Sequence, residues 1–377
     1  MRATDLGVRF GGLPRGPLNA ITDVPGVLVG HSTVIEGEGA LRVGDGPVRT
    51  GITVIRPHGG EPFAEPVFGG FHRLNGNGEF TGIHWVEESG LVTGDIGLTN
   101  THSVGVVRDT LVDMAARRLG SRGDEWFLPL VGETWDGVLS DIVGQHVTPR
   151  HVREAWGDAH GGAVPEGSVG GGTGMICHGF KGGIGTSSRV VAVGDDRYTV
   201  GVLLQANHGR RERLSIAGVP VGRLIPEAEF PVPASAPGQG AGSVIGVIAT
   251  DAPLLPHQCR RLAQRAGLGI ARCGAVGEHS SGDLFLAFST AARGAIPADD
   301  GHDGRAELLE LTSLSNRAAG LLFDAVVDAA EESVVNAMLA AATMTGRDGA
   351  TAHALPHDRL RELLRTDASA QRVAHEG

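Results

Sequence analysis

The chain has 377 residues, 41% of them hydrophobic, so it is long enough to bury a large core. Its formal net charge of −11 argues against a surface for nucleic acids or anionic membranes. The first residues lack the apolar segment of a signal peptide, and no stretch approaches the roughly 18 apolar residues of a membrane helix. We therefore expect a cytoplasmic protein with neither a nucleic acid nor a membrane as partner.

Cysteine and histidine spacing gives no sign of a bound group. Three isolated cysteines suit a reducing compartment. The histidines fit no metal-ligand motif, and the glycine-rich run 168–174 matches neither phosphate-binding pattern. We therefore predict no metal and no cofactor. The histidines in polar surroundings are predicted to make structural hydrogen bonds: His84, His102, His178 and His208.

Strands and helices are expected to alternate along the chain. Short β-branched or apolar runs predict strands at 51–55, 96–99, 190–193, 198–204, 244–250 and 284–288. Helical spacing predicts helices from about Gly105, after Asp251 as N-cap, and from about 316 to 343 with Gly346 as the stop. This alternation favours sheets layered with helices.

The junction between Gly242 and Ser243 separates two very different segments. Residues 231–242 are rich in proline, alanine and glycine and are expected to form a solvated linker, whereas 244–249 is an apolar strand. If the Gly242–Ser243 bond is cut, Ser243 becomes an N-terminal residue with both a hydroxyl and an amine. That is the arrangement of an N-terminal-nucleophile hydrolase. The alternative is an ordinary turn from loop to strand.

Two further polar groups stand at strand ends. Ser281 and Asp283 precede the strand 284–288, where a hydroxyl and a carboxylate can point into one pocket beside Ser243 and assist a nucleophile. Asn207 follows the strand 198–204 and can donate its amide to an oxyanion. Turn and backbone-capping roles are the alternatives for all three.

Several longer strings resemble one family, the P1 (DmpA-like) peptidases, which comprise L-aminopeptidase/D-esterases and β-peptidyl aminopeptidases. The resemblance covers nearly the whole chain and includes the Gly242-Ser243 and Ser281-Gly282-Asp283 motifs. The other matching strings are Gly16–Val27, Leu74–Glu79, Thr99–Gly105, Glu166–Gly174, Ala249–Gln258, Asn336–Leu339 and His353–Asp358.

The resemblance implies a fold and a maturation pathway. The fold would be an αββα four-layer sandwich, similar in architecture to Ntn hydrolases and related to ornithine acetyltransferase. Residues 1–377 would form one domain, cut by the protein itself into 1–242 (α chain) and 243–377 (β chain). The processed units would assemble as a homo-oligomer, a tetramer, without metal or organic cofactor. The substrates would be short peptides, amino-acid amides or esters.

The resemblance also implies roles for individual residues. Ser243 matches the nucleophile, which would form an acyl-enzyme, and Ser281 and Asp283 match the residues that assist it. Asn207 matches an asparagine on the oxyanion side. Glu133 matches an acidic position that lines the pocket and suits the substrate's ammonium group. Whether the proton passes to the new amine of Ser243 or to the Ser281–Asp283 pair remains open.

Trp135 departs from the family pattern, where a tyrosine is common. An indole N–H can donate a hydrogen bond but cannot exchange a proton as a phenol does. Two alternatives to an aminopeptidase stay open, and Trp135 is a hint only for the second. One is an acyltransferase related to ornithine acetyltransferase, although that relative uses threonine where this chain has Ser243. The other is a catalytically weakened, amine-binding homologue.

Overall fold

The structure, a computed structural model, describes residues 1–120, 125–233, 242–294 and 309–376, with side chains as far as 366. Its main strands form two sheets. The smaller sheet has the order β1 (Leu28–Glu36), β2 (Val48–Arg56), β5 (Ile96–Asn100) and β6 (Leu130–Thr134). The larger has the order β4 (Leu91–Val92), β3 (Val67–Gly76), β12 (Gly282–Ser289), β11 (Ser243–Thr250), β10 (Asp196–Asn207) and β9 (Gly183–Val193).

Most neighbouring strands are antiparallel, but each sheet contains one parallel pair. These pairs are β5 with β6 in the smaller sheet and β11 with β12 in the larger sheet. Two short hairpins complete the β structure: β7 (Ile176–Cys177) with β8 (Phe180–Lys181), and β13 (Met344–Thr345) with β14 (Thr351–Ala352).

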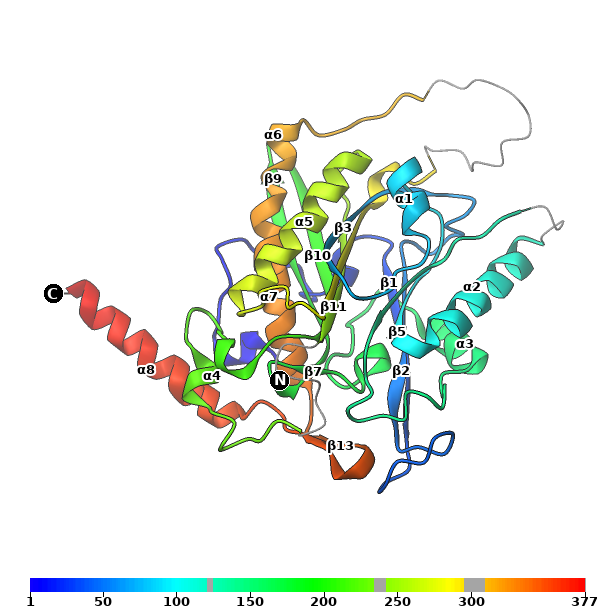
Figure 1. The fold of residues 1–377 in the computed structure, drawn as a ribbon. Helices are drawn as coiled ribbons and strands as arrows, with labels where there is room; N and C mark the ends of the chain where they lie inside the picture. The colour runs from blue at the N-terminus through cyan, green and yellow to red at the C-terminus, as the bar shows by residue number, and fades with distance from the viewer. Residues whose placement is uncertain (121–124, 234–241, 295–308, 377) are drawn as a thin grey trace.

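Helices cover the outer face of each sheet. α2 (Val104–Leu119) and α3 (Pro149–Asp158) pack on the smaller sheet, and α5 (Pro256–Arg272) and α7 (Leu322–Ala340) pack on the larger one. Figure 1 shows the resulting order of helices, sheet, sheet and helices, which is the expected αββα sandwich. The other α-helices are α1 (Ile83–Ser89), α4 (Val221–Leu224), α6 (Asn316–Ala319) and α8 (His357–Glu376). Short 3-10 helices span Ala3–Leu6, Ile21–Asp23, Thr101–Ser103, Gly170–Gly172, Arg211–Arg213, Thr290–Ala292 and Arg347–Gly349.

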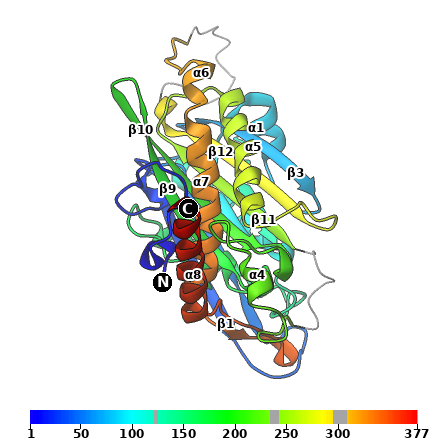
Figure 2. The ribbon, with the colours of Figure 1, turned by 90° about the vertical axis from the view of Figure 1, so that its left-hand side faces the viewer.

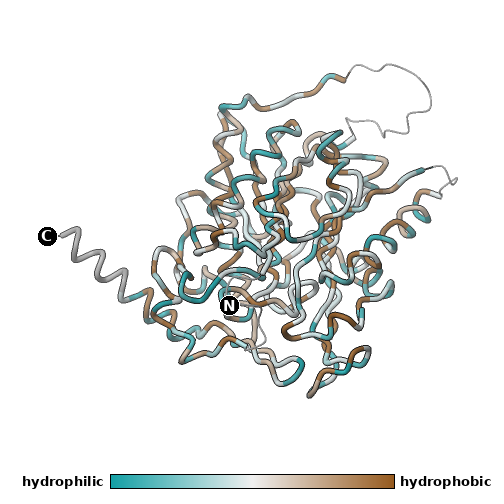
Figure 3. The backbone as a smooth tube through the Cα atoms, viewed as in Figure 1, coloured by the Kyte–Doolittle hydropathy of each residue, from teal (hydrophilic) through white to brown (hydrophobic). Residues whose placement is uncertain are grey.

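Apolar side chains fill the spaces between the layers. Along β11, Val244 and Ile248 face the helices, whereas Ile245 and Val247 face the smaller sheet, so the strand is buried on both faces. Brown, apolar stretches of the tube accordingly lie in the middle of the molecule (Figure 3). Every residue of β11 is therefore surrounded by protein, including the first.

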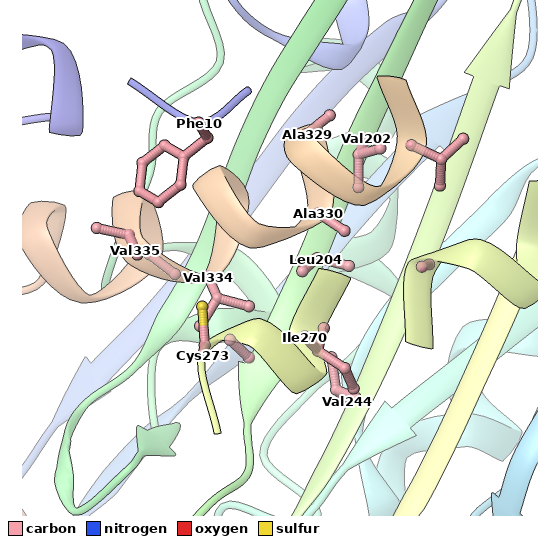
Figure 4. Packing of buried hydrophobic residues seen from close by; sticks show 14 of the residues in the cluster. Phe10, Val202, Leu204, Val244, Ile270, Cys273, Ala329, Ala330, Val334 and Val335 are labelled. Carbon is pink, nitrogen blue, oxygen red and sulfur yellow. The ribbon is translucent and has the colours of Figure 1, made fainter. Parts of the chain in front are cut away.

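Helix α7 packs closely on β9 and β10. Its small side chains Ala329 and Ala330 lie near Val202 and Leu204 of β10, with Val334 further along the helix (Figure 4). Small residues on a helix let its axis approach a sheet closely. Seen from the side in Figure 2, α5 and α7 lie over the larger sheet.

The predicted N-cap of α5 is wrong. Asp251 does not begin the helix, because its carboxylate accepts the backbone N–H of Thr199 at 2.7 Å. The helix begins at Pro256 after Leu255 as the N-cap residue. Proline is favoured in the first helical turn because the N–H groups there have no acceptor within the helix, so a residue without an N–H loses no hydrogen bond. The inward-facing residues of α5 agree with the prediction: Cys259, Leu262, Ala263 and Ala266.

The predicted helix over 316–343 is divided and ends earlier. α6 stops at Ala319, Gly320 follows as its C-cap, and α7 runs from Leu322 to Ala340. The chain then becomes extended at Ala341, and β13 follows, so Gly346 is not the helix stop. Within the described residues, no helix combines the length and apolar character needed to cross a membrane.

Candidate active site

A pocket of about 450 Å³ lies where the starts of β11 and β12 meet the ends of β5 and β6. Residues 77–79, which follow the end of β3, also line it, so three segments of the larger sheet and two of the smaller one contribute. The lining residues are Asn77, Gly78, Glu79, Thr101, Glu133, Trp135, Gly242, Ser243 and Ser280. The sequence assigned roles to four of these: Gly242, Ser243, Glu133 and Trp135.

Ser243 is the first residue of β11 and is only 6% exposed. Its Oγ accepts a hydrogen bond from the backbone N–H of Gly282 at 3.1 Å. Gly282 begins the neighbouring parallel strand, so this donor is fixed by the sheet. An N–H aimed at a hydroxyl oxygen stabilises negative charge that develops there.

Ser281 and Asp283 lie behind the pocket. The Ser281 hydroxyl donates to Asp283 Oδ1 at 2.6 Å, and Asn75 Oδ1 accepts the Asp283 N–H at 2.8 Å. Both side chains are almost completely buried, and the pocket wall is formed by the preceding Ser280. Burial raises the pKa of Asp283 to about 6, against hydrogen bonds from Ser281 and the backbone of Val244. The pair thus lies against the backbone of β11, whereas we expected it to point into the pocket.

Asn207 ends β10 directly opposite Ser243 in the antiparallel pair. Opposed residues of such a pair project from the same face of the sheet. Asn207 Oδ1 accepts the Ile176 N–H at 2.8 Å, and its Nδ2 donates to the Trp135 carbonyl at 3.0 Å. These bonds fix the amide and use one of its two N–H groups.

Glu133 supplies a buried carboxylate on the opposite wall. It is 3% exposed, accepts the backbone N–H of Glu79 at 3.0 Å, and accepts the hydroxyl of Thr101. Burial raises its pKa, while the two donors oppose that shift. A carboxylate with two fixed donors and a face toward a pocket suits a positively charged ligand group.

Buried hydrogen bonds fix the segment 134–136, which follows Glu133. Asp136 is completely buried and accepts an amide N–H of Asn100 at 2.9 Å, and burial raises the Asp136 pKa to about 6. Gln205 of β10 crosses between the sheets and donates to Thr134 Oγ1 at 2.7 Å. Trp135, half-buried between these anchored residues, therefore has a fixed backbone against Asn207.

Gly242 occupies a position where a larger residue does not fit. A Cβ atom there would overlap the carbonyl oxygen of Asn207 and crowd the Cα of His208. The glycine therefore brings the backbone before Ser243 directly against the end of β10. Most of the predicted linker 231–242 lies outside the described residues.

Sequence reasoning assigned no role to several pocket residues. Asn77, Glu79, Thr101 and Ser280 line the pocket, but their local sequences are typical of turns and strand ends. The available signal was their presence in, or next to, the strings that resemble the peptidase family. Their functional side chains come together only when the two sheets pack.

Comparison with known proteins agrees with this geometry. Residues 19–352 match peptidase family S58. The chain belongs to that family. It is 47% identical to the β-peptidyl aminopeptidase BapA of Sphingosinicella microcystinivorans over 373 residues, which cover 97% of this chain and 92% of the relative. This S58 member is accordingly a serine aminopeptidase.

Two solved structures show the same fold. A Burkholderia β-aminopeptidase has a TM-score of 0.90 and 49% identity, covering 97% of this chain and 99% of its own. The L-aminopeptidase D-Ala-esterase/amidase of Ochrobactrum anthropi has a TM-score of 0.88 and 44% identity, with the same coverage. The latter is described as a prototype of the serine aminopeptidases and a new variant of the Ntn hydrolase fold. The S58 chain therefore has this Ntn-type αββα architecture.

Proposed function

We propose that the S58 chain is one domain that cuts itself between Gly242 and Ser243 and then removes N-terminal residues from short peptides, amino-acid amides or esters. The carrying observation is that Ser243 begins a central strand inside the pocket, opposite the buried carboxylate of Glu133. One wall thus offers a nucleophile and the other an acceptor for a free amine. The pocket volume of about 450 Å³ suits a small ligand.

Self-cleavage would begin with the Ser243 hydroxyl. Its Oγ attacks the carbonyl carbon of Gly242, the C–N bond breaks, and the acyl group moves from nitrogen to oxygen as an ester. Water then hydrolyses that ester and leaves a Gly242 carboxylate and a free Ser243 amine. The close approach of Gly242 to the Asn207 backbone supports this step, since it fixes the scissile carbonyl beside β10.

Turnover would use the same oxygen. The substrate ammonium binds Glu133, and Ser243 Oγ attacks the carbonyl of the N-terminal residue. The remaining N–H of Asn207 Nδ2 is on the correct face of the sheet to donate to the oxyanion. The leaving amine or alcohol takes a proton, and water then hydrolyses the ester of the acyl-enzyme, which releases the acid and restores the Ser243 hydroxyl. The proton acceptor is the Ser243 amine or the Ser281–Asp283 pair.

The relatives' names indicate two substrate classes that share one feature. A β-peptidyl aminopeptidase and an L-aminopeptidase/D-Ala-esterase both act next to a free N-terminal amine. We infer the same requirement here, with Glu133 as its structural basis. An acyltransferase is the less favoured alternative, because the relatives on which the family assignment rests are aminopeptidases.

Intact mass under denaturing conditions tests the proposal. The wild-type protein should give two species that match 1–242 and 243–377, and Ser243→Ala should give only the full-length chain. Ser280→Ala is the matched control, because it removes another hydroxyl of the same pocket and should leave cleavage intact. Free-amine and N-acetylated forms of each amide and ester should then be compared as substrates.

Two results would overturn the proposal. Full-length wild-type protein that nevertheless turns over substrate would remove the need for an N-terminal serine. Equal turnover of acetylated and free-amine substrates would remove the role of Glu133. Preferential acyl transfer to an added amine, instead of to water, would support the acyltransferase.

A further inference from the structure

A cluster of side chains that can bind a metal ion lies next to Asn207 and outside the residues that line the pocket. Cys177 is the last residue of β7, His178 follows it in the turn to β8, and His208 directly follows β10. The sulfur and one imidazole nitrogen from each histidine all lie within 4.8 Å of one another. The three side chains are 0%, 0% and 4% exposed. Their spacing in the sequence matches no metal motif, so only the fold brings them together.

The His178 imidazole is held in a form that can bind a metal ion through Nε2. His178 Nδ1 lies 3.1 Å from the Arg210 carbonyl, a contact that requires the proton on Nδ1 and leaves a lone pair on Nε2. Within the described part of the chain, neither His178 Nε2 nor His208 Nε2 has a hydrogen-bond partner. A histidine fixed in this way through its other nitrogen is typical of metal ligands.

The surrounding backbone is shaped to hold the ring of His178. His178 has a φ of 48°, in the left-handed region, at the turn between β7 and β8. Gly209 packs directly against this imidazole, and a Cβ atom at residue 209 would overlap the ring. A histidine in a rare backbone conformation, with a glycine opposite it, indicates a position that is fixed on both sides.

The sulfur and nitrogen atoms need only a small adjustment to share an ion. Cys177 Sγ and His208 Nδ1 are 4.0 Å apart. Metal–sulfur and metal–nitrogen bonds of about 2.3 and 2.0 Å put two ligand atoms about 3.7 Å apart in a trigonal site. Small changes of the side-chain torsion angles would therefore close the cluster.

Charge decides which ion suits the cluster. The buried Lys181 amine donates to the carbonyls of Gly172, Met175 and Gly182 at 3.3, 2.9 and 2.9 Å. Arg211 donates to the carbonyl of His178 at 3.0 Å. No carboxylate is a member of the cluster among the described residues. One thiolate neutralises a monovalent ion, whereas a divalent ion would leave a net positive charge close to the Arg211 guanidinium, which already binds the His178 carbonyl.

We propose that Cys177, His178 and His208 form a site for a single Cu(I) ion, held by one thiolate and two neutral imidazoles. Thiolate and imidazole are ligands that this soft ion prefers. As the copper–sulfur bond forms, the Cys177 thiol releases one proton to solvent. No change of oxidation state is involved. The argument for this site does not depend on the proposed Ser243 chemistry.

The ion would connect the two segments that hold Asn207. His208 follows Asn207 in the chain, and Cys177 follows Ile176, whose N–H donates to the Asn207 side chain. Copper would therefore cross-link the β7 end to the β10 end. We expect the loaded protein to unfold at a higher temperature than the metal-free protein, because the ion binds only the folded arrangement.

Anaerobic titration of metal-free, full-length protein with Cu(I), in competition with a chromogenic Cu(I) chelator, tests the site. One equivalent of copper should bind, and affinity should fall at least a hundredfold in Cys177→Ala and in His208→Gln. Cys259→Ala is the matched control, because it removes another fully buried thiol from α5 and should retain the wild-type affinity. Circular dichroism of each variant checks that it is folded.

X-ray absorption spectroscopy of the copper-loaded wild-type protein identifies the atoms bound to the ion, and it tests the site even if a variant does not fold. One sulfur and two imidazole nitrogens around the ion are expected. A different ligand set, no stoichiometric copper, or unchanged affinity in folded Cys177→Ala would each overturn the site. Stoichiometric Zn(II) in preference to Cu(I) would overturn the charge argument and with it the choice of ion.

Discussion

The active-site pocket joins the two parallel strand pairs of the molecule, and the two pairs contribute opposite chemistry. The start of β11 and β12 presents a hydroxyl and the N–H of Gly282 that donates to it. The end of β5 and β6 presents the carboxylate of Glu133 with two donors already bound to it. In the proposed reaction, the strand starts would stabilise the negative charge that develops on the reacting oxygen, and the strand ends would bind the substrate's positively charged amine.

The largest effect on kcat/KM is expected from Glu133, at the ends of β5 and β6. Glu133→Gln should lower kcat/KM for free-amine substrates about a thousandfold, because a buried ammonium would lose its charged partner. Steady-state kinetics with free-amine amides measures this change. Glu79→Gln is the matched control, since Glu79 lines the same pocket but is exposed, and its effect should stay below about tenfold. Similar losses in both variants would mean that the acidic pocket acts by general charge and not through Glu133.

The Ser281–Asp283 pair, at the start of β12, should make kcat/KM depend on pH. If the Ser281–Asp283 pair accepts the proton, wild-type kcat/KM should fall as the pH drops through about 6, the raised pKa of Asp283. Asp283→Asn should lower kcat/KM about a hundredfold and abolish that acidic limb. A pH–rate profile of both proteins measures it. An acidic limb that persists in the variant would exclude Asp283 as its source and leave the Ser243 amine or Glu133, whose pKa is also raised by burial.

The same carboxyl group gives an opposite trend in stability. Its pKa is about 6 in the folded protein and 3.8 for an unperturbed aspartic acid, so the folded state binds more protons between these values. The contribution of Asp283 to folding stability is therefore greatest below about pH 4 and decreases as the pH rises to 6. Asp283→Asn should remove this dependence. Thermal unfolding between about pH 4 and 7, compared for the two proteins, separates this effect from catalysis.

The smallest effect is expected at Trp135, between the two ends. Trp135→Tyr restores the residue common in the family pattern, and a phenol that donates to the oxyanion should raise kcat about tenfold. Single-turnover acylation measures the step directly. Trp126→Tyr, an exposed aromatic packed on Phe63 away from the pocket, is the control and should change nothing. A slower Trp135→Tyr enzyme would show that the indole is itself adapted to the substrate.

The two ends also differ in how well the sequence predicts them. Ser243 stands at a sharp change from a proline- and glycine-rich segment to an apolar strand, so the local pattern marks the junction, but that pattern also fits an ordinary turn and the family resemblance was needed to assign a role. Glu133 lies within an apolar stretch, and its role came only from the family resemblance. Thr101 and Glu79 have no local signal, because their function arises from the packing of two sheets.

Helix boundaries show the same limit of local pattern. Asp251 has a side chain suited to an N-cap, but its carboxylate accepts the backbone N–H of Thr199 in the neighbouring strand β10 instead of an N–H of the helix. Cys177, His178 and His208 likewise have no distinctive local sequence, since the hairpin β7–β8 and the end of β10 meet only in the folded chain. Local rules identify elements well, and they fail where a distant strand competes for the same polar group.

The position of β11 between β10 and β12 has a consequence for the matured protein. A cut before Ser243 would leave β10 on one polypeptide and β11 on the other, with α7 of the second piece packed on β9 and β10 of the first. The larger sheet would then be divided between the two pieces, whereas the smaller sheet would lie entirely in the first piece. Unfolding would become dissociation of a heterodimer, with a melting temperature that depends on protein concentration, whereas the uncut precursor would unfold as a single molecule. After cleavage, refolding would therefore require two polypeptides to associate, whereas the precursor would refold as one chain.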